Sequence, residues 1–291
     1  MDAGVVLQIL FPVFVLILIG YFYGRRYNPE LVSANQLNMR LFVPALVFDS
    51  LTEANFEATN LVNLVIAALF VVIGSGLLAW PIARFFKYPL PIFIPPMMFN
   101  NCGNMGLPVA LLAFGESGLQ IALVLFLVSN TLHFTLGVRL VGGKMSFNGV
   151  FFNAVNVAMV AGIAVNLLQL PLPETIALPI KMLGQIAIPL MLVSLGVRMV
   201  GVNLETISTG LVGALVRPLV GVLSAVLVVT WLPLSSLEVQ SVILFAALPP
   251  AVLNYLFAEQ FGQSPQQVAA IVIAGNAIAV AVLYITLLFI L

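Results

Sequence analysis

The sequence consists almost entirely of long apolar stretches, separated by short connections that carry the charges and the turn residues. A helix needs about 20 predominantly apolar residues to cross the roughly 30 Å hydrocarbon layer of a bilayer. We mark ten stretches of that kind: Val5–Tyr23, Leu31–Leu51, Leu61–Ala83, Pro89–Phe114, Gly118–Leu140, Gly149–Leu170, Thr175–Val197, Thr206–Leu232, Leu237–Glu259 and Gln266–Leu291. The pattern predicts an all-α integral membrane protein with ten transmembrane helices and no extramembrane domain.

The composition supports this class and excludes others. Hydrophobic residues make up 62% of the chain and charged residues 7%, against about 25% charged in an average globular protein. Ten basic residues balance ten acidic ones, so there is no basic excess to bind nucleic acid. One cysteine, Cys102, and one histidine, His133, are too few for a Cys/His zinc site. We therefore expect a lipid bilayer as surroundings, and no nucleic-acid partner, metal or cofactor.

The charges in the connections predict the orientation in the cell membrane. Basic residues collect in short cytoplasmic loops, and seven fall at the connections after the first, third, fifth and seventh stretches: Arg25, Arg26, Arg84, Lys87, Arg139, Lys144 and Arg198. Acidic residues fall at connections on the other side: Glu53, Glu57, Glu116, Glu174 and Glu238. We expect both termini outside the cytoplasm and the middle of the chain, around Val141–Phe147, inside it.

The two halves of the chain resemble each other. The sequence around Pro44 aligns with that around Pro189, and the stretch that begins at Phe114 aligns with the one that begins at Phe261. Both offsets are close to half of the chain. Five spans per half is an odd number, so the second half enters the membrane from the opposite side. We predict two inverted five-helix repeats, residues 1–145 and 146–291, a plan that many secondary transporters share.

The fourth and ninth stretches contain residues that interrupt a helix. Proline, glycine and asparagine at mid-depth free backbone groups, which is tolerated only inside protein or beside a cavity. The first break is predicted around Gly103, Gly106 and Pro108, and the second at Pro249 and Pro250. Because helix ends and amides suit anions, we predict a substrate site between the breaks, formed by Asn101, Asn104 and Asn254 and walled by Asn130 and Asn276. The alternative is that these asparagines only repair broken backbone or join helices.

Three further residues inside the predicted spans are candidates for function. Arg217 is the deepest cation, and no acid lies at similar depth, so we assign it to the substrate site as a source of positive potential. Arg40 and His133 are candidates for coupling transport to an ion. The alternatives are that Arg40 bonds helix-end carbonyls and that His133 is simply hydrogen-bonded to a neighbour. The spans hold no paired acids or acid/histidine set for intramembrane catalysis, so we expect no enzyme.

Several motifs give the chain a family resemblance. They are Ile19-Gly20-Tyr21, Leu41-Phe42-Val43-Pro44-Ala45-Leu46, Asn101 to Pro108, Val216-Arg217-Pro218 with Gly221, and Ala246-Ala247-Leu248-Pro249. With them the chain resembles the auxin efflux carrier family, which includes plant PIN-type carriers and bacterial permeases. The resemblance implies a scaffold domain and a moving domain with crossing broken helices four and nine, in an elevator-type carrier that is often a homodimer. Where the plant-like pattern has a proline, this chain has Asn254, and its prolines are Pro249 and Pro250.

The function expected from these features is secondary active transport of a small organic anion. Bacterial-type members of the family are associated with malate or malonate, so the resemblance implies a carboxylate, with H⁺ or Na⁺ as candidate coupling ions. One alternative is a sodium-coupled symporter of the bile-acid type, although such sites usually need a buried carboxylate that the broken stretches lack. Another, from a different class, is a membrane sensor or scaffold without transport, for which the chain offers no extramembrane domain.

Overall fold

The computed structural model describes residues 3–54, 58–144, 153–200 and 207–291. Within these ranges the chain is helical and contains no strand, apart from one isolated bridge between Asn100 and Pro250. The predicted outer residue Glu57 and the predicted starts of two spans, Gly149 and Thr206, lie outside the described residues. The all-α prediction is therefore confirmed for the part of the chain that the structure covers.

The helices follow one another with short connections. Their bounds are α1 (Ala3–Tyr27), α2 (Val32–Leu37), the π-helical turn η1 (Asn38–Phe42), α3 (Val43–Thr52), α4 (Ala58–Phe85), α5 (Leu90–Met98), η2 (Cys102–Gly106), α6 (Leu107–Leu132), η3 (His133–Gly137), α7 (Val138–Leu140), α9 (Ala154–Leu167), α10 (Glu174–Arg198), α11 (Ile207–Val229), α12 (Ser236–Ala247), α13 (Leu253–Gln260) and α14 (Pro265–Ile290).

Several of these helices suit a bilayer. Within the described ranges, six are long and apolar enough to cross one: Ala3–Tyr27, Asn60–Phe85, Cys102–Leu140, Glu174–Arg198, Ser208–Val229 and Pro265–Ile290. The helices Ala154–Leu167 and Ser236–Ala247 are apolar but shorter. Large apolar side chains such as Phe11, Leu77 and Phe289 are exposed on the surface, as expected where lipid is the solvent. The protein is a multi-pass membrane protein.

Local sequence explains where several helices begin and bend. Ser235 and Glu238 form a reciprocal capping box at the start of α12, which satisfies two backbone donors that a helix start leaves free. Within α6, Gly115 has a φ of 69° and produces a kink, a conformation that glycine adopts without a steric penalty. The kink lies between the predicted end of the fourth stretch at Phe114 and the predicted start of the fifth at Gly118.

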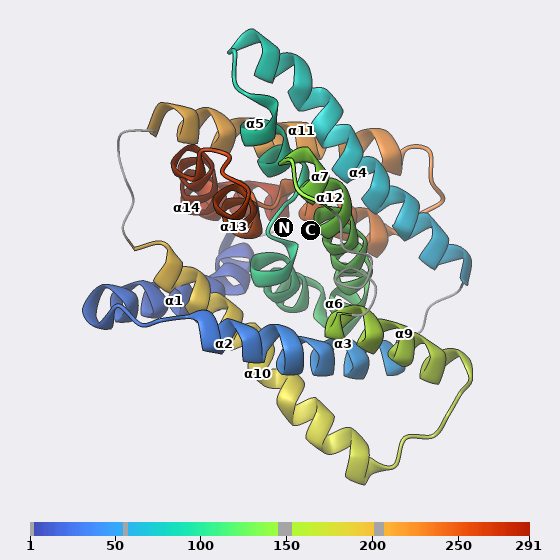
Figure 1. Cartoon of the computed structure of the whole chain (residues 1–291). Helices are drawn as coiled ribbons and strands as arrows, with labels where there is room; N and C mark the ends of the chain where they lie inside the picture. The colour runs from blue at the N-terminus through green and yellow to red at the C-terminus, as the bar shows by residue number, and fades with distance from the viewer. Residues whose placement is uncertain (1–2, 55–57, 145–152, 201–206) are drawn as a thin grey trace.

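The helices form two groups, which we name by their contents (Figure 1). The frame group contains α1, α2, η1, α3, α9 and α10, where α10 packs on α1 and α3, and α9 packs on α3. The crossing group contains α4, α5, η2, α6, η3, α7, α11, α12, α13 and α14, where α11 packs on α4, α12 and α14. The groups meet where α1 contacts α6 and α14, where α3 contacts α6, and where α10 contacts η2.

Glycines hold the frame group together at close range. A Cβ atom added at Gly196 of α10 would overlap the backbone carbonyl of Ile17 in α1. One added at Gly20 of α1 would overlap the backbone carbonyl of Val193 in α10. The two backbones are therefore in direct contact, as small residues allow between membrane helices. Any larger residue at either position must push α1 away from α10.

Candidate functional site

Two interrupted helices meet inside the crossing group. The first interruption, residues 99–101, follows α5, and the second, residues 248–252, follows α12; together we name them the crossing. The Asn101 N–H donates to the Pro249 carbonyl at 2.7 Å, and the Ala251 N–H donates to the Phe99 carbonyl at 3.0 Å. Unpaired backbone polar groups are costly without water. Each break thus supplies hydrogen-bond partners for backbone that the other break leaves free.

Two asparagines join the crossing to α14. The Asn101 side-chain amide donates to Oδ1 of Asn276 at 2.9 Å. In turn, Nδ2 of Asn276 donates to the carbonyls of Pro250 at 3.0 Å and Val272 at 2.8 Å. Pro250 and Val272 therefore occupy both amide hydrogens of Asn276. Asn276 is the residue through which α14 is fixed to both breaks at once.

Asn254 and His133 form a second connection at the breaks. Nδ2 of Asn254 donates to the carbonyls of Phe99 at 3.0 Å and Ala251 at 2.9 Å, and its Oδ1 lies 3.0 Å from Nε2 of His133. An amide oxygen only accepts, so Nε2 of His133 carries the proton. The imidazole also stacks on the Phe99 ring, with centroids 4.1 Å apart. His133 is thus a buried donor that helps to fix the first break.

The end of α12 is held by two more side chains. Nδ2 of Asn100 donates to the Phe245 carbonyl, and Nη1 of Arg217 donates to the Ala246 carbonyl at 3.2 Å. A guanidinium is favourable there because helix C-termini carry partial negative charge. Arg217 is 0% exposed, and its Nε and Nη2 have no hydrogen-bond partner among the described residues. The structure therefore places Arg217 at the C-terminal end of α12.

The remaining residues singled out from the sequence lie near the crossing or away from it. Gly106 approaches the second break so closely that an added Cβ would lie 2.7 Å from a methyl carbon of Leu248. Gly103 and the half-buried Asn104 lie in η2, and Pro108 lies in the first turn of α6. Asn130 is buried in α6, where its carbonyl accepts from the His133 N–H. Arg40 is exposed on η1 and does not join the network of the crossing.

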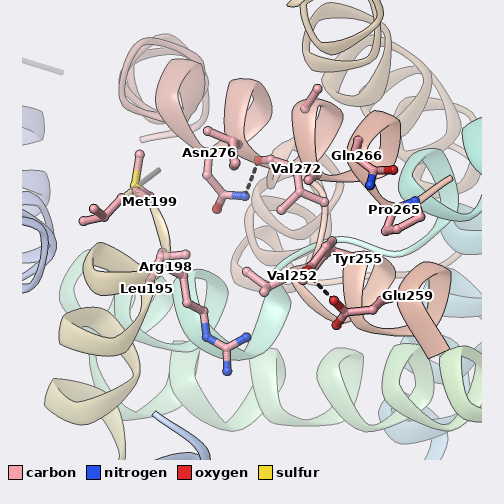
Figure 2. Close-up of a pocket in the computed structure, with 14 residues that line it drawn as sticks. Leu195, Arg198, Met199, Val252, Tyr255, Glu259, Pro265, Gln266, Val272 and Asn276 are labelled. Carbon is pink, nitrogen blue, oxygen red and sulfur yellow. Dashed lines mark hydrogen bonds between the residues drawn. The ribbon is translucent and has the colours of Figure 1, made fainter. Parts of the chain in front are cut away.

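A pocket of about 380 Å³ lies beside the crossing, between the two groups of helices (Figure 2). The frame group contributes the end of α10, including Leu195 and Arg198, and the crossing group contributes α13 and the first half of α14. The polar residues in the lining are Arg198, Tyr255, Glu259, Gln266 and Asn276. The Tyr255 hydroxyl donates to Oε1 of Glu259 at 2.8 Å. Of the site residues predicted from sequence, Asn276 is the one in this lining.

Comparison with known proteins identifies the family of the chain. The family model described as "Membrane transport protein" matches residues 5–149 and 143–289. The chain belongs to this family. A protein of Rhizobium meliloti (strain 1021) with the name "Putative malonate transporter" is 27% identical over 301 residues, which covers 94% of this chain and 92% of that protein. The chain is thus a membrane transport protein and not an enzyme.

Sequence reasoning missed most of the pocket of this membrane transport protein. The sequence predicts Arg198 as a charge that marks the cytoplasmic surface, and it assigns no role to Tyr255, Glu259 or Gln266. A usable signal exists, because Tyr255 and Glu259 are four residues apart directly after the second break, and such residues share a helix face. Arg198 has no such signal, because only the packing of α10 against its neighbours brings it to the pocket.

Proposed function

We propose that this membrane transport protein is a secondary active carrier of a small organic carboxylate, and that the substrate occupies the pocket between α10, α13 and α14. The observation that carries the proposal is that a guanidinium, Arg198, lines a pocket of suitable size beside the meeting point of two broken helices. Guanidinium groups bind carboxylates through strong charge-assisted hydrogen bonds. The name of the Rhizobium meliloti relative supports malonate as a first substrate to test.

The proposed architecture is ten spans in two inverted repeats, residues 1–145 and 146–291, with both termini outside the cytoplasm. It is supported by the two interrupted helices, one in each half, whose breaks pair in antiparallel fashion. With that orientation, Arg198 marks the cytoplasmic end of α10, so the pocket is open toward the cytoplasm. The homodimer and the relation to plant auxin carriers stay predictions from the family resemblance.

The proposed mechanism is of the elevator type, in which the crossing group moves against the frame group and carries the substrate with it. Two observations support this division. Backbone contact at Gly20 and Gly196 joins α1 to α10 within the frame group, and hydrogen bonds from Asn101, Asn254 and Asn276 join both breaks and α14 within the crossing group. The pocket lies at the boundary between the units, where such a movement changes its access.

In this proposal the asparagines hold the crossing together, whereas the sequence predicts that they form the substrate site. Pro250 and Val272 already occupy both amide hydrogens of Asn276, and two carbonyls likewise occupy those of Asn254. An anion that binds Asn276 must therefore compete with the hydrogen bonds of the crossing. We propose that Arg198 supplies the direct charge for the substrate, that Arg217 contributes long-range positive potential, and that Asn101 and Asn276 transmit occupancy of the pocket to the crossing. Coupling to H⁺ or Na⁺, through His133 or Arg40, stays a prediction.

Uptake of labelled malonate into liposomes that contain the purified protein tests the proposal. Arg198→Gln should lower uptake at least tenfold, because a hydrogen bond to a charged group contributes about 1.5–3 kcal/mol. Arg139→Gln, which removes an exposed cation on the same predicted face, is the matched control. Asn101→Ala should reduce uptake as well. Equal uptake by Arg198→Gln and Arg139→Gln would overturn the assignment of the pocket. Uptake measured under an imposed sodium gradient and under an imposed proton gradient would identify the coupling ion.

A further inference from the structure

The pocket contains one positive and one negative side chain. Among the described residues that line it, Arg198 on α10 and Glu259 on α13 are the charged ones. Figure 2 shows both side chains extending into the space between α10 and α13. Glu259 is exposed and accepts a hydrogen bond from Tyr255. The described lining is therefore neutral overall, although the proposed substrate class is anionic.

The two charges lie on different groups of helices and are not neutralised by each other. Arg198 belongs to the frame group and Glu259 to the crossing group, and the structure records no ion pair between these two described residues. Each charge thus remains available to a bound molecule. A carboxylate that pairs with Arg198 extends the rest of its molecule toward α13 and α14, because those helices form the remainder of the lining.

On the α13 side, the pocket offers a hydrogen-bond acceptor, the Glu259 carboxylate. An ionised carboxylate accepts hydrogen bonds and donates none, and the Tyr255 hydroxyl already donates its hydrogen to Glu259. A second full negative charge placed there would be repelled by Glu259 and would find no free donor on Tyr255. A hydroxyl, an amide or a protonated carboxyl group would instead donate to Glu259.

We propose that Glu259 is a specificity-determining residue that selects a monoanion with a hydrogen-bond donor at the end opposite its carboxylate. This inference rests on the proposed function of the pocket and narrows its substrate class. The class comprises half-protonated dicarboxylic acids, hydroxy acids and half-amides of diacids. The fully ionised dicarboxylate is the disfavoured form, and Glu259 is the reason.

The expected effect is modest because Glu259 is exposed to water. A unit charge acting over roughly 6 Å in a water-like dielectric changes binding by about threefold. Competition measurements resolve that difference when the competitors share one scaffold. Malonate carries two charges at neutral pH, malonamate carries one charge and an amide donor, and monomethyl malonate carries one charge and no donor at its ester end.

The experiment measures how each of these three compounds inhibits uptake of labelled malonate at one fixed, neutral pH. In the unaltered protein, malonamate should inhibit more strongly than monomethyl malonate and malonate. In Glu259→Gln, malonate should gain about threefold relative to malonamate, because the repulsion is removed while the size of the side chain is kept. Tyr255→Phe should not reproduce this gain, because it leaves the charge of Glu259 in place.

The matched control is Glu30→Gln, which removes an exposed carboxylate on the same predicted face, outside the pocket. If Glu259→Gln and Glu30→Gln give the same ratio of malonate to malonamate inhibition as the unaltered protein, the role of Glu259 is overturned while the carrier function stands. If liposomes that contain the unaltered protein take up no more labelled malonate than empty liposomes, the proposed function and this inference fail together. A change in the ratio of malonate to malonamate inhibition in Glu259→Gln, but not in Glu30→Gln, supports both the carrier function and the role of Glu259.

Discussion

The contact between α1 and α10 in the frame group and the crossing in the other group are held together by different physical means. In the frame group, α1 and α10 are in backbone contact at Gly20 and Gly196. In the crossing group, two helices stop at mid-length, and asparagine side chains bond the backbone groups that the breaks expose. The first arrangement depends on the absence of side-chain atoms and the second on the presence of specific ones.

The two groups contribute different parts of the pocket. The frame group contributes the end of α10, including one charged residue, Arg198. The crossing group contributes polar surface next to broken backbone, with Asn276 shared between the pocket and the crossing. In the proposed elevator mechanism, the frame group stays in place while the crossing group moves against it with the substrate.

Substitution at the glycine contact should have the largest effect on stability. Gly196→Ala places a methyl group on the Ile17 carbonyl of α1, and only separation of the two helices relieves the overlap. Overpacking of this kind costs about 1–3 kcal/mol or more, and we expect loss of monodisperse protein on size-exclusion chromatography. Gly103→Ala is the control, because its Cβ would lie 3.2 Å from a movable side chain, Phe126. Normal elution of Gly196→Ala would show that α1 and α10 are not in backbone contact.

Substitution at the crossing should have the next largest effect. Asn254→Ala removes the acceptor of His133 Nε2 and one donor to each of two carbonyls, and a buried group left unsatisfied costs about 1–3 kcal/mol. The temperature of thermal unfolding in detergent should fall clearly. Asn104→Ala should have little effect, because Asn104 is half-buried and its side chain makes no hydrogen bond in the described part of the chain. A smaller loss for Asn254→Ala than for Asn104→Ala would mean that the asparagines do not fix the crossing.

The sequence predicts that both helices break, because the cause of a break is local. It places the second break correctly at Pro249 and Pro250, but the first helix is interrupted at residues 99–101, before the predicted Gly103, Gly106 and Pro108, which lie in η2 and α6. Proline lacks an N–H group, and Pro249 and Pro250 lie within the second interruption, whereas Pro95 and Pro96 lie inside α5, shortly before the first interruption at residues 99–101. A single proline was not a sufficient signal, since Pro81, Pro189 and Pro218 all lie inside continuous helices. The helix continues there because losing one backbone hydrogen bond bends a helix more often than it ends it.

The partners of the predicted residues could not be read from the sequence. The depth of Arg217 was evident, but its contact with the Ala246 carbonyl depends on how α11 packs against the end of α12. Arg198 was predicted at a membrane surface, and its place in a pocket depends on the approach of α10 to α13 and α14. These are contacts between segments far apart in the chain, which neither hydrophobic period nor composition specifies.

The most direct test of whether the pocket between the two groups binds the substrate is to measure whether the substrate protects an introduced cysteine in the pocket from chemical labelling. Cys102 is the sole cysteine of the chain and is buried, so Cys102→Ser removes background, and Ala269→Cys then places a thiol in the pocket lining. We expect malonate or malonamate to slow the reaction of this thiol with a membrane-impermeant maleimide, and the added Arg198→Gln substitution to abolish that protection. A reaction rate that is the same with and without the acids, while the protein still transports them, would contradict the assignment of the pocket.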